Sequence, residues 1–303
     1  MTRHNRPRLC FIGFGEAGQA FASGFREAGV EHIAAWDILF PQSEGQRLKQ
    51  AGEKLGIRLG ESAADALRGA DIVISAVTAA SSLVAAESVK PHLRGELFYL
   101  DINSVSPGRK RETAAYLGDA ARYVDVAVMA PVHPARHQTP VLLAGPNAET
   151  VEPILGDLGM RPSLAGPEIG AAAAIKMVRS VMVKGLEALT LECFLAAARA
   201  GVEERVIASL SKSYPGLDWP AMIEYNLERM ASHGTRRAAE MEEVADTLRE
   251  LGVEPLMAGA TVERQREMGR LGQRAEIRAA IAEGREALMN AISAAKRGVA
   301  ERQ

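Results

Sequence analysis

The feature that most constrains the fold is a glycine pattern near the start of the chain. The apolar run Leu9–Ile12 leads into G-x-G-x-x-G, and small and apolar residues at helical spacing follow. A strand, a tight turn and a helix in this order form a cradle for a pyrophosphate, because glycine permits the turn and close backbone approach. Glycine triplets also occur in ordinary turns and in methyltransferases. The predicted cofactor-binding residues of this segment are Gly13, Phe14, Gly15, Glu16, Ala17 and Gly18.

The first half of the chain alternates strand-like and helix-like segments. The runs 71–77 and 97–101 are almost wholly apolar, which is typical of strands buried on both faces of a parallel sheet. Ser62 and Pro107 stand where helices are expected to begin. The sequence therefore predicts an α/β protein with an N-terminal, Rossmann-type doubly wound sheet.

The second half carries almost no strand signal after Gly166. Apolar residues recur at helical spacing in a long predicted helix, which is expected to bury them. These residues are Ile175, Val178, Met182, Leu186, Leu189 and Cys193. Gly234 is expected to end a later helix, and Thr235 to cap the next. We expect a dinucleotide-binding domain at 1–165 and, joined by the long helix, an all-α substrate and dimerisation domain at 166–303.

Composition excludes several other classes of protein. The 303 residues are 47% apolar and carry a net charge of −2, which gives no reason to expect a nucleic-acid or membrane partner. Cys10 and Cys193 share no metal-ligand spacing, so reduced cysteines and no metal site are expected. No signal peptide is recognisable, so we expect a cytoplasmic location.

Asp37 closes the second predicted strand at the distance expected for an acid that binds the adenosine ribose. Its carboxylate would accept hydrogen bonds from the ribose hydroxyls and repel a 2′-phosphate, which favours NAD over NADP. Arg47 lies near enough in the sequence to leave NADP possible. The alternative is an aspartate that serves only the turn after the strand.

Lys176 is the strongest candidate for catalysis. Ser180 follows it by four residues and shares its side of the predicted helix. An amine shielded from water by the alanines at 171–174 would exchange a proton with a substrate oxygen more easily than a solvated one. The alternative is an ordinary solvated lysine on a helix surface.

The order of four motifs resembles the β-hydroxyacid dehydrogenase family, which includes 3-hydroxyisobutyrate and 6-phosphogluconate dehydrogenases. The motifs are the glycine pattern, Asp101–Pro107, Asp125–Val128 and Gly166–Gly170 leading to Lys176. The sequence after Lys176 resembles that of a branch of this family with a distinctive helical C-terminal domain.

The resemblance implies roles for individual residues. Val77 and Thr78 would lie beside the cofactor, and Asn103 and Ser104 match the segment that binds the substrate carboxylate. Lys176 matches the catalytic lysine, which takes the hydroxyl proton as hydride leaves the carbon, or returns it in reduction.

The chain also departs from the family pattern in the substrate pocket. Ser180 replaces the usual Asn, and Met129–Pro131 replaces the usual Ser-Gly-Gly. His133 is a candidate substrate contact or second proton carrier, or else a loop histidine bonded to backbone.

Arg236 and Arg237 stand in the first turn of the helix expected after Thr235. There they either bind an anionic group of the substrate or are solvated, with Glu240 offsetting their charge.

These residues and the family resemblance together predict an NAD(P)-dependent dehydrogenase, NAD preferred, acting on a small anionic β-hydroxy acid or its carbonyl counterpart. The alternatives are oxidative decarboxylation of the 6-phosphogluconate type and a non-catalytic dinucleotide sensor. Lys176 argues against imine reduction, whose enzymes generally lack this lysine. Apolar faces on successive helices suggest a homodimer or higher homo-oligomer.

Overall fold

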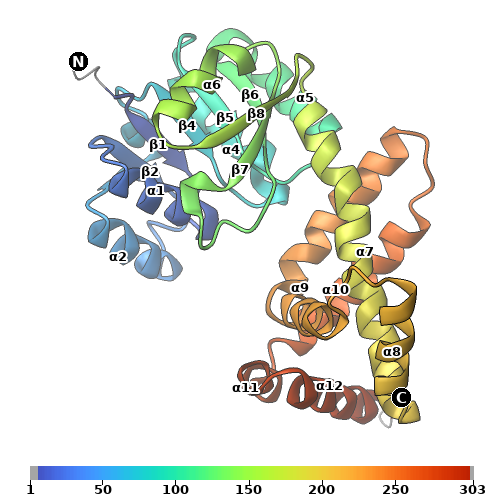
Figure 1. The fold of residues 1–303 in the computed structure, drawn as a ribbon. Coiled ribbons are helices and arrows are strands. Elements are labelled where there is room, and N and C mark those ends of the chain that lie inside the picture. The colour runs from blue at the N-terminus through green and yellow to red at the C-terminus, as the bar shows by residue number, and fades with distance from the viewer. Residues whose placement is uncertain (1–5, 301–303) are drawn as a thin grey trace. The chain divides into compact units, whose positions relative to one another are not determined.

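An eight-stranded sheet forms the centre of the first half of the chain in the computed structural model, which describes residues 6–300, with side chains as far as 296 (Figure 1). Its strands are β1 (Leu9–Ile12), β2 (Ile33–Trp36), β3 (Arg58–Leu59), β4 (Ile72–Ser75), β5 (Phe98–Asp101), β6 (Arg122–Val128), β7 (Pro140–Ala144) and β8 (Arg161–Gly166). They lie in the order β3-β2-β1-β4-β5-β6-β7-β8, and every neighbouring pair is parallel except β6 and β7. The predicted doubly wound sheet is confirmed.

Helices cover both faces of this sheet, because neighbouring residues of each strand point to opposite sides. Phe11 of β1 packs in the core under the helices α1 and α6, whereas Cys10 packs in the core under α3, α4 and α5. The α-helices of this half are α1 (Glu16–Glu27), α2 (Gln46–Lys54), α3 (Ala63–Ala66), α4 (Ser82–Val89), α5 (Pro107–Leu117) and α6 (Ala148–Asp157). Short 3₁₀ turns occur at η1 (Ser43–Gly45), η2 (Ala79–Ser81), η3 (Lys90–His92), η4 (Gly118–Ala120) and η5 (Arg136–Gln138). Burial raises the pKa of the Cys10 thiol to about 12, so this cysteine stays protonated and unreactive.

Two predicted helix starts are confirmed. The Ser62 hydroxyl accepts a hydrogen bond from the Asp65 amide at 3.1 Å and caps α3. Pro107 is the first residue of α5, and the Ser106 hydroxyl caps that helix.

The chain divides into two compact units between Met177 and Val178, inside the long helix α7 (Ala171–Ala200). The second unit is helical, as predicted, and its core is formed by apolar side chains from the end of α7 and the helices that follow. These helices are α8 (Glu203–Ser213), α9 (Trp219–Glu250), α10 (Leu256–Leu271), α11 (Ala275–Glu283) and α12 (Arg285–Ala300). The predicted roles of the two parts, cofactor binding and substrate binding with dimerisation, stay predictions.

The predicted helix break at Gly234 and Thr235 is wrong, because α9 runs through both residues without interruption. Gly234 lies where α9 crosses α10, and a Cβ there would come within 2.5 Å of the Gln265 carbonyl oxygen and the Gly269 amide. The glycine is therefore needed for close contact between two helix backbones and not for a helix end.

The predicted burial of the apolar stripe on α7 is also wrong within the chain. Met182 is 64% exposed and Leu189 54%, and Val178 and Leu186 are exposed as well. The periodicity identified one face of the helix correctly, but the described residues leave that face exposed.

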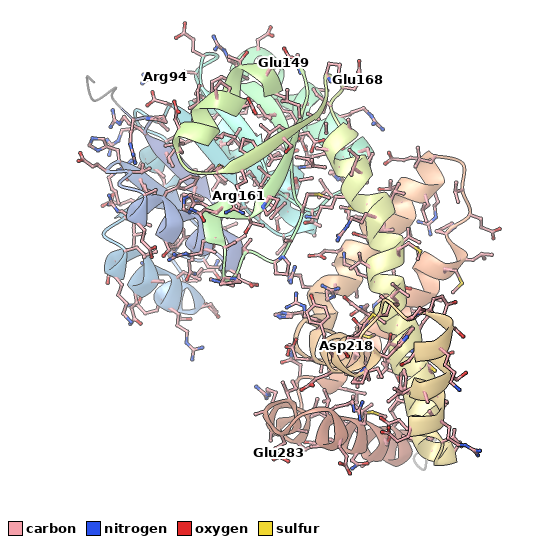
Figure 2. The ribbon with its side chains drawn as sticks, in the orientation of Figure 1. Arg94, Glu149, Arg161, Glu168, Asp218 and Glu283 are labelled. Atoms are coloured by element: carbon pink, nitrogen blue, oxygen red, sulfur yellow. The ribbon has the colours of Figure 1, made fainter. Side chains whose placement is uncertain are left out.

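Charged side chains lie at the surfaces of both units, as Figure 2 shows for the exposed residues Arg94, Glu149 and Asp218. Among the described residues, no helix combines the length and apolar character needed to cross a membrane.

Candidate functional site

Two positions accept only glycine, one in the turn between β1 and α1 and one in the first turn of α1. Gly13 has a φ of +90°, and a Cβ there would lie 2.4 Å from the Ala76 carbonyl oxygen. A Cβ on Gly18 would lie 2.6 Å from the Gly13 carbonyl oxygen. The first glycine thus brings the turn against the end of β4, and the second brings α1 against the turn.

Gly15, at the centre of the motif, differs from the other two glycines. It is the N-cap of α1, and a Cβ built on it would meet no atom of a described, non-neighbouring residue within 4 Å. The space beside the helix start is open, and the first amides of α1 carry the positive end of the helix dipole. This arrangement fits the pyrophosphate of a dinucleotide.

Asp37 follows β2 and is held by two backbone amides. Its Oδ2 accepts from the Phe14 amide at 2.7 Å, and its Oδ1 accepts from the Leu39 amide at 2.9 Å. The bond from Leu39 is the local contact expected if Asp37 serves only the turn after the strand. The bond from Phe14 ties the carboxylate to the glycine turn. Each oxygen keeps a further lone pair that a ribose hydroxyl can use.

Asn103 joins the loops that follow β4 and β5. The side chain is buried, its Oδ1 accepts from the Val77 amide at 2.7 Å, and its Nδ2 donates to Ser75 Oγ at 2.9 Å. Its amide group is therefore engaged inside the protein. Ser104, the next residue, is only half-buried, and its hydroxyl contacts Lys176.

Lys176 lies against Ser104, although 72 residues separate them in the chain. Its Nζ donates to Ser104 Oγ at 2.6 Å, and the lysine is half-buried. The start of α7 is fixed by Asp125 in the middle of β6. Its Oδ2 accepts from the Gly170 and Ala173 amides, each at 3.1 Å. The loop after β5 and the helix after β8 thus bring a hydroxyl and an amine together.

The predicted residues of the first unit follow one edge of the sheet in spatial order. Asp37 follows β2, the glycine turn follows β1, Val77 and Thr78 follow β4, and Ser104 follows β5. Strands β1 and β4 are neighbours whose connections leave in opposite directions, which is the switch point where such sheets bind ligands. A dinucleotide that lay along these strand ends would have Asp37 at one end and the Lys176–Ser104 pair at the other.

The segment after β6 packs through a different histidine from the predicted one. His133 is exposed. His137 is buried instead, with its ring centre 5.2 Å from that of Phe25, and burial lowers the pKa of its imidazole. His137 therefore packs against α1.

Three predicted substrate residues lie in the helical unit. Ser180 is buried on α7, one turn after Lys176. Arg236 pairs with Glu240 on its own helix, and the buried Arg237 forms a two-point ion pair with Glu187. Because α9 does not begin at Thr235, the free helix-start amides expected beside the two arginines are absent. Of the two features that suggested an anion site, the arginines and the free amides, only the arginines remain.

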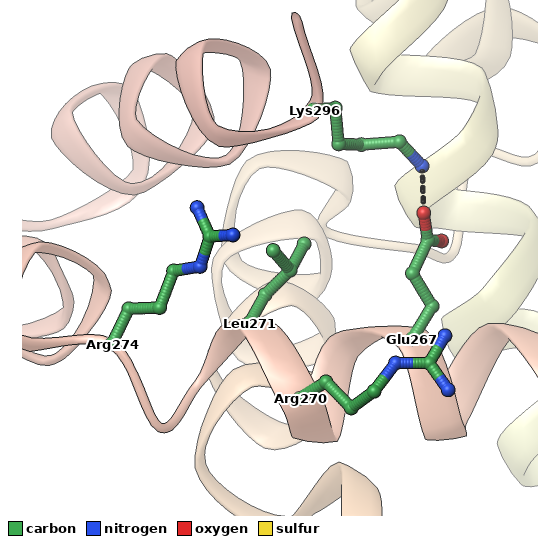
Figure 3. Close-up of a pocket in the computed structure, with 5 residues that line it drawn as sticks. All are labelled: Glu267, Arg270, Leu271, Arg274 and Lys296. Atoms are coloured by element: carbon green, nitrogen blue, oxygen red, sulfur yellow. Dashed lines mark ion pairs between the residues drawn. The ribbon is translucent and has the colours of Figure 1, made fainter. Parts of the chain in front are cut away.

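A hollow of about 290 Å³ lies in the helical unit between α10 and α12 (Figure 3). It is lined by Glu267, Arg270, Leu271, Arg274 and Lys296. The Glu267 carboxylate pairs with Lys296 at 2.6 Å and with Arg264 at 2.6 Å. The Lys296 pair connects α12 with α10, and the Arg264 pair lies within α10, so we assign both to packing. In the part of the chain that the structure describes, no three His, Cys, Asp or Glu residues gather as metal ligands would.

Lys110, on α5 of the first unit, is a residue near the Lys176–Ser104 pair that the sequence analysis did not single out. It is 1% exposed and lies between Asp101 and Asp125. A lysine on a helix ordinarily reaches solvent, so its position in the sequence carried no signal.

Two protein-family models match segments of this chain. One family model, described as NADP oxidoreductase coenzyme F420-dependent, matches residues 8–104. Another, a domain of unknown function (DUF1932), matches residues 197–268.

Three individual proteins illustrate the likeness. The structure of a conserved hypothetical protein from Sinorhizobium meliloti 1021 is 35% identical and covers 95% of this chain and 96% of its own, with a TM-score of 0.71. That of the conserved protein MTH1747, of unknown function and structurally similar to 3-hydroxyacid dehydrogenases, is 32% identical. It covers 88% of this chain and 100% of its own, with a TM-score of 0.69. The NAD-dependent L-serine dehydrogenase of Pseudomonas aeruginosa is 26% identical over 227 residues, 72% of this chain and 73% of that protein. The chain belongs to the β-hydroxyacid dehydrogenase family of NAD(P)-dependent oxidoreductases, and it carries a helical C-terminal domain.

Proposed function

We propose that this protein transfers hydride between NAD(P) and a small β-hydroxy acid, with Lys176 as the general acid and base. The observation that carries the proposal is the 2.6 Å contact between Lys176 Nζ and Ser104 Oγ. An amine and a hydroxyl at the sheet edge beside the glycine cradle are the groups that proton transfer and substrate orientation require.

The protein's own residues have separate tasks in this mechanism. The glycine turn and the start of α1 would hold NAD(P), which would supply the hydride acceptor or donor. Ser104 binds the substrate through its hydroxyl and holds the reacting carbon near Lys176. Lys176 Nζ takes the proton of the substrate hydroxyl during oxidation and returns it during reduction.

The substrate is sought among short hydroxy acids. The L-serine dehydrogenase relative supports L-serine as the first candidate, and the family resemblance supports 3-hydroxyisobutyrate and 6-phosphogluconate. Each acid is incubated with NAD and with NADP, and reduced cofactor is followed by its absorbance. Carbon dioxide release is measured in parallel to detect decarboxylation. If no acid reduces either cofactor although both bind, the dinucleotide-sensor alternative replaces the dehydrogenase.

We propose that Asp37 makes the protein prefer NAD. Its carboxylate stands beside the glycine turn, and the next residue, Ile38, is 72% exposed and apolar, so neither residue favours a 2′-phosphate. In the double variant Asp37→Ser/Ile38→Arg, the ratio of kcat/KM for NADP to that for NAD is expected to rise at least about tenfold, because repulsion becomes attraction. The matched control is Glu44→Gln, which removes an exposed carboxylate of a nearby turn and should leave the ratio unchanged. An unaltered ratio in the double variant would remove Asp37 from cofactor selection.

We propose that the exposed stripe on α7 is covered by a second copy of the chain. Monomeric proteins rarely expose a continuous apolar patch of this kind. A charge at its centre, Met182→Asp, is expected to produce monomers, because an unpaired buried charge opposes association by several kcal/mol, of order 2–5. Light scattering gives the mass, and Ala198→Asp, at an exposed position of α7 outside the stripe, is the control. A wild-type protein that is already monomeric at high concentration would refute the proposal.

A further inference from the structure

Lys110 is a buried charge that the proposed reaction does not use directly. It projects from α5 and is 1% exposed. Its Nζ lies 3.1 Å from Asp101 Oδ1 and 3.4 Å from Asp125 Oδ1, and it donates to the Asp101 carbonyl oxygen at 2.5 Å.

The two carboxylates need such a cation. Asp101 and Asp125 are direct partners in the pairing of β5 with β6, and both are completely buried. Like charges at opposed positions of a sheet repel, and the interior offers little screening. Apart from Lys110, Asp125 Oδ1 has no hydrogen-bond partner among the described residues. Lys110 is therefore the group that lets both carboxylates remain side by side.

Each carboxylate also holds one half of the reactive pair. Asp101 Oδ1 accepts from the Asn103 amide at 3.0 Å and so fixes the loop immediately before Ser104. Asp125 Oδ2 accepts from the Gly170 and Ala173 amides and so fixes the first turn of the helix that carries Lys176. The ammonium group between the two carboxylates connects the loop with the helix.

We propose that Lys110 is a positioning residue that sets the separation of Lys176 Nζ and Ser104 Oγ. It acts through Asp101 and Asp125 and touches neither substrate nor cofactor. The inference rests on the proposed function for its kinetic consequence, whereas its structural consequence can be measured without any substrate.

The test is Lys110→Met, which keeps the length of the side chain and removes its charge. For whichever acid the screen identifies, kcat is expected to fall about 100-fold, since a misplacement of about 1 Å has that effect. The KM for NAD should stay within about twofold, because the glycine cradle is untouched. A crystal structure of the variant should show Lys176 Nζ and Ser104 Oγ beyond hydrogen-bond distance.

Two further variants separate positioning from simple loss of stability. Tyr123→Phe removes the 2.8 Å hydrogen bond from Tyr123 to Asp101 Oδ2 in the same buried cluster but leaves Lys110 in place. It should lower the melting temperature while kcat and the separation stay at the wild-type values. Lys110→Arg keeps the charge with a different shape and should recover part of kcat. If Lys110→Met does not fold, Lys110→Arg carries the test and should show a kcat about tenfold below wild type at a normal KM for NAD.

A folded Lys110 variant with wild-type kcat, or with the wild-type Lys176–Ser104 separation, overturns the inference. If the wild-type protein oxidises none of the acids, the proposed function fails first. The separation in the Lys110→Met crystal then still decides the inference, and an unchanged separation overturns it.

Discussion

Replacing Lys176 with alanine is expected to lower turnover of the hydroxy acid by about 10²–10⁴-fold, the usual contribution of a positioned acid or base. The substrate would lose the group that takes its hydroxyl proton, while Ser104 and the glycine cradle remain. The dissociation constant for NAD should change by no more than about twofold, because Lys176 lies at the far end of the site from Asp37 and the cradle. Steady-state rates with the acid from the screen give the first quantity, and NADH fluorescence titration gives the second.

The matched control for this prediction is Lys54→Ala, which removes an exposed lysine at the end of α2. It should leave both turnover and cofactor binding at the wild-type level. Near-normal turnover in Lys176→Ala would remove the lysine from the mechanism, and a large loss of NAD affinity would assign it to cofactor binding instead.

Replacing Gly15 with valine is expected to weaken NAD binding by at least about 100-fold without loss of stability. Its φ of −73° lies outside the left-handed region that favours glycine. The added Cβ would meet no atom of a described, non-neighbouring residue within 4 Å, so the fold is expected to accept the side chain. The valine fills the space that the pyrophosphate would occupy and removes about two charge-assisted hydrogen bonds, each worth about 1.5–3 kcal/mol. Calorimetric titration with NAD and a thermal melt measure the two effects.

Gly18→Ala is the counterpart of Gly15→Val. Its Cβ would lie 2.6 Å from the Gly13 carbonyl oxygen, so this smaller substitution should lower the melting temperature where the larger one does not. Wild-type NAD affinity in Gly15→Val would show that the cofactor does not approach this glycine.

The sheet was predictable because its signals are local. Strands such as β4 and β5 are continuous apolar runs, and the glycine turn and the Ser106–Pro107 cap occur at fixed offsets from them. The helical unit was harder to predict, because a glycine such as Gly234 can either end a helix or allow two helices to touch. Only the neighbouring α10 decides between these meanings, and that contact is absent from a local sequence pattern.

The candidate site shows the same limit. Residue types alone left Lys176 open to a surface role, and the family resemblance supplied its pairing with the Asn103–Ser104 segment. Lys110 was not predicted, since its burial depends on Asp101 and Asp125 being opposed in the sheet. The stripe on α7 was visible as a periodicity, but periodicity does not reveal whether the chain or another molecule covers a helix face.

The crossing of α9 and α10 has a mechanical consequence. Cβ atoms at Gly234 or Gly269 would lie 2.3–2.5 Å from backbone atoms of the facing helix, so backbone against backbone sets the spacing of the two helices there. Backbone atoms cannot move aside as side chains do by changing rotamer. The pair of helices α9 and α10 is therefore expected to move as one rigid body. Any bending within the helical unit is therefore expected in its connections, such as residues 214–218 and 251–255, and hydrogen exchange should be fast there and slow at the crossing.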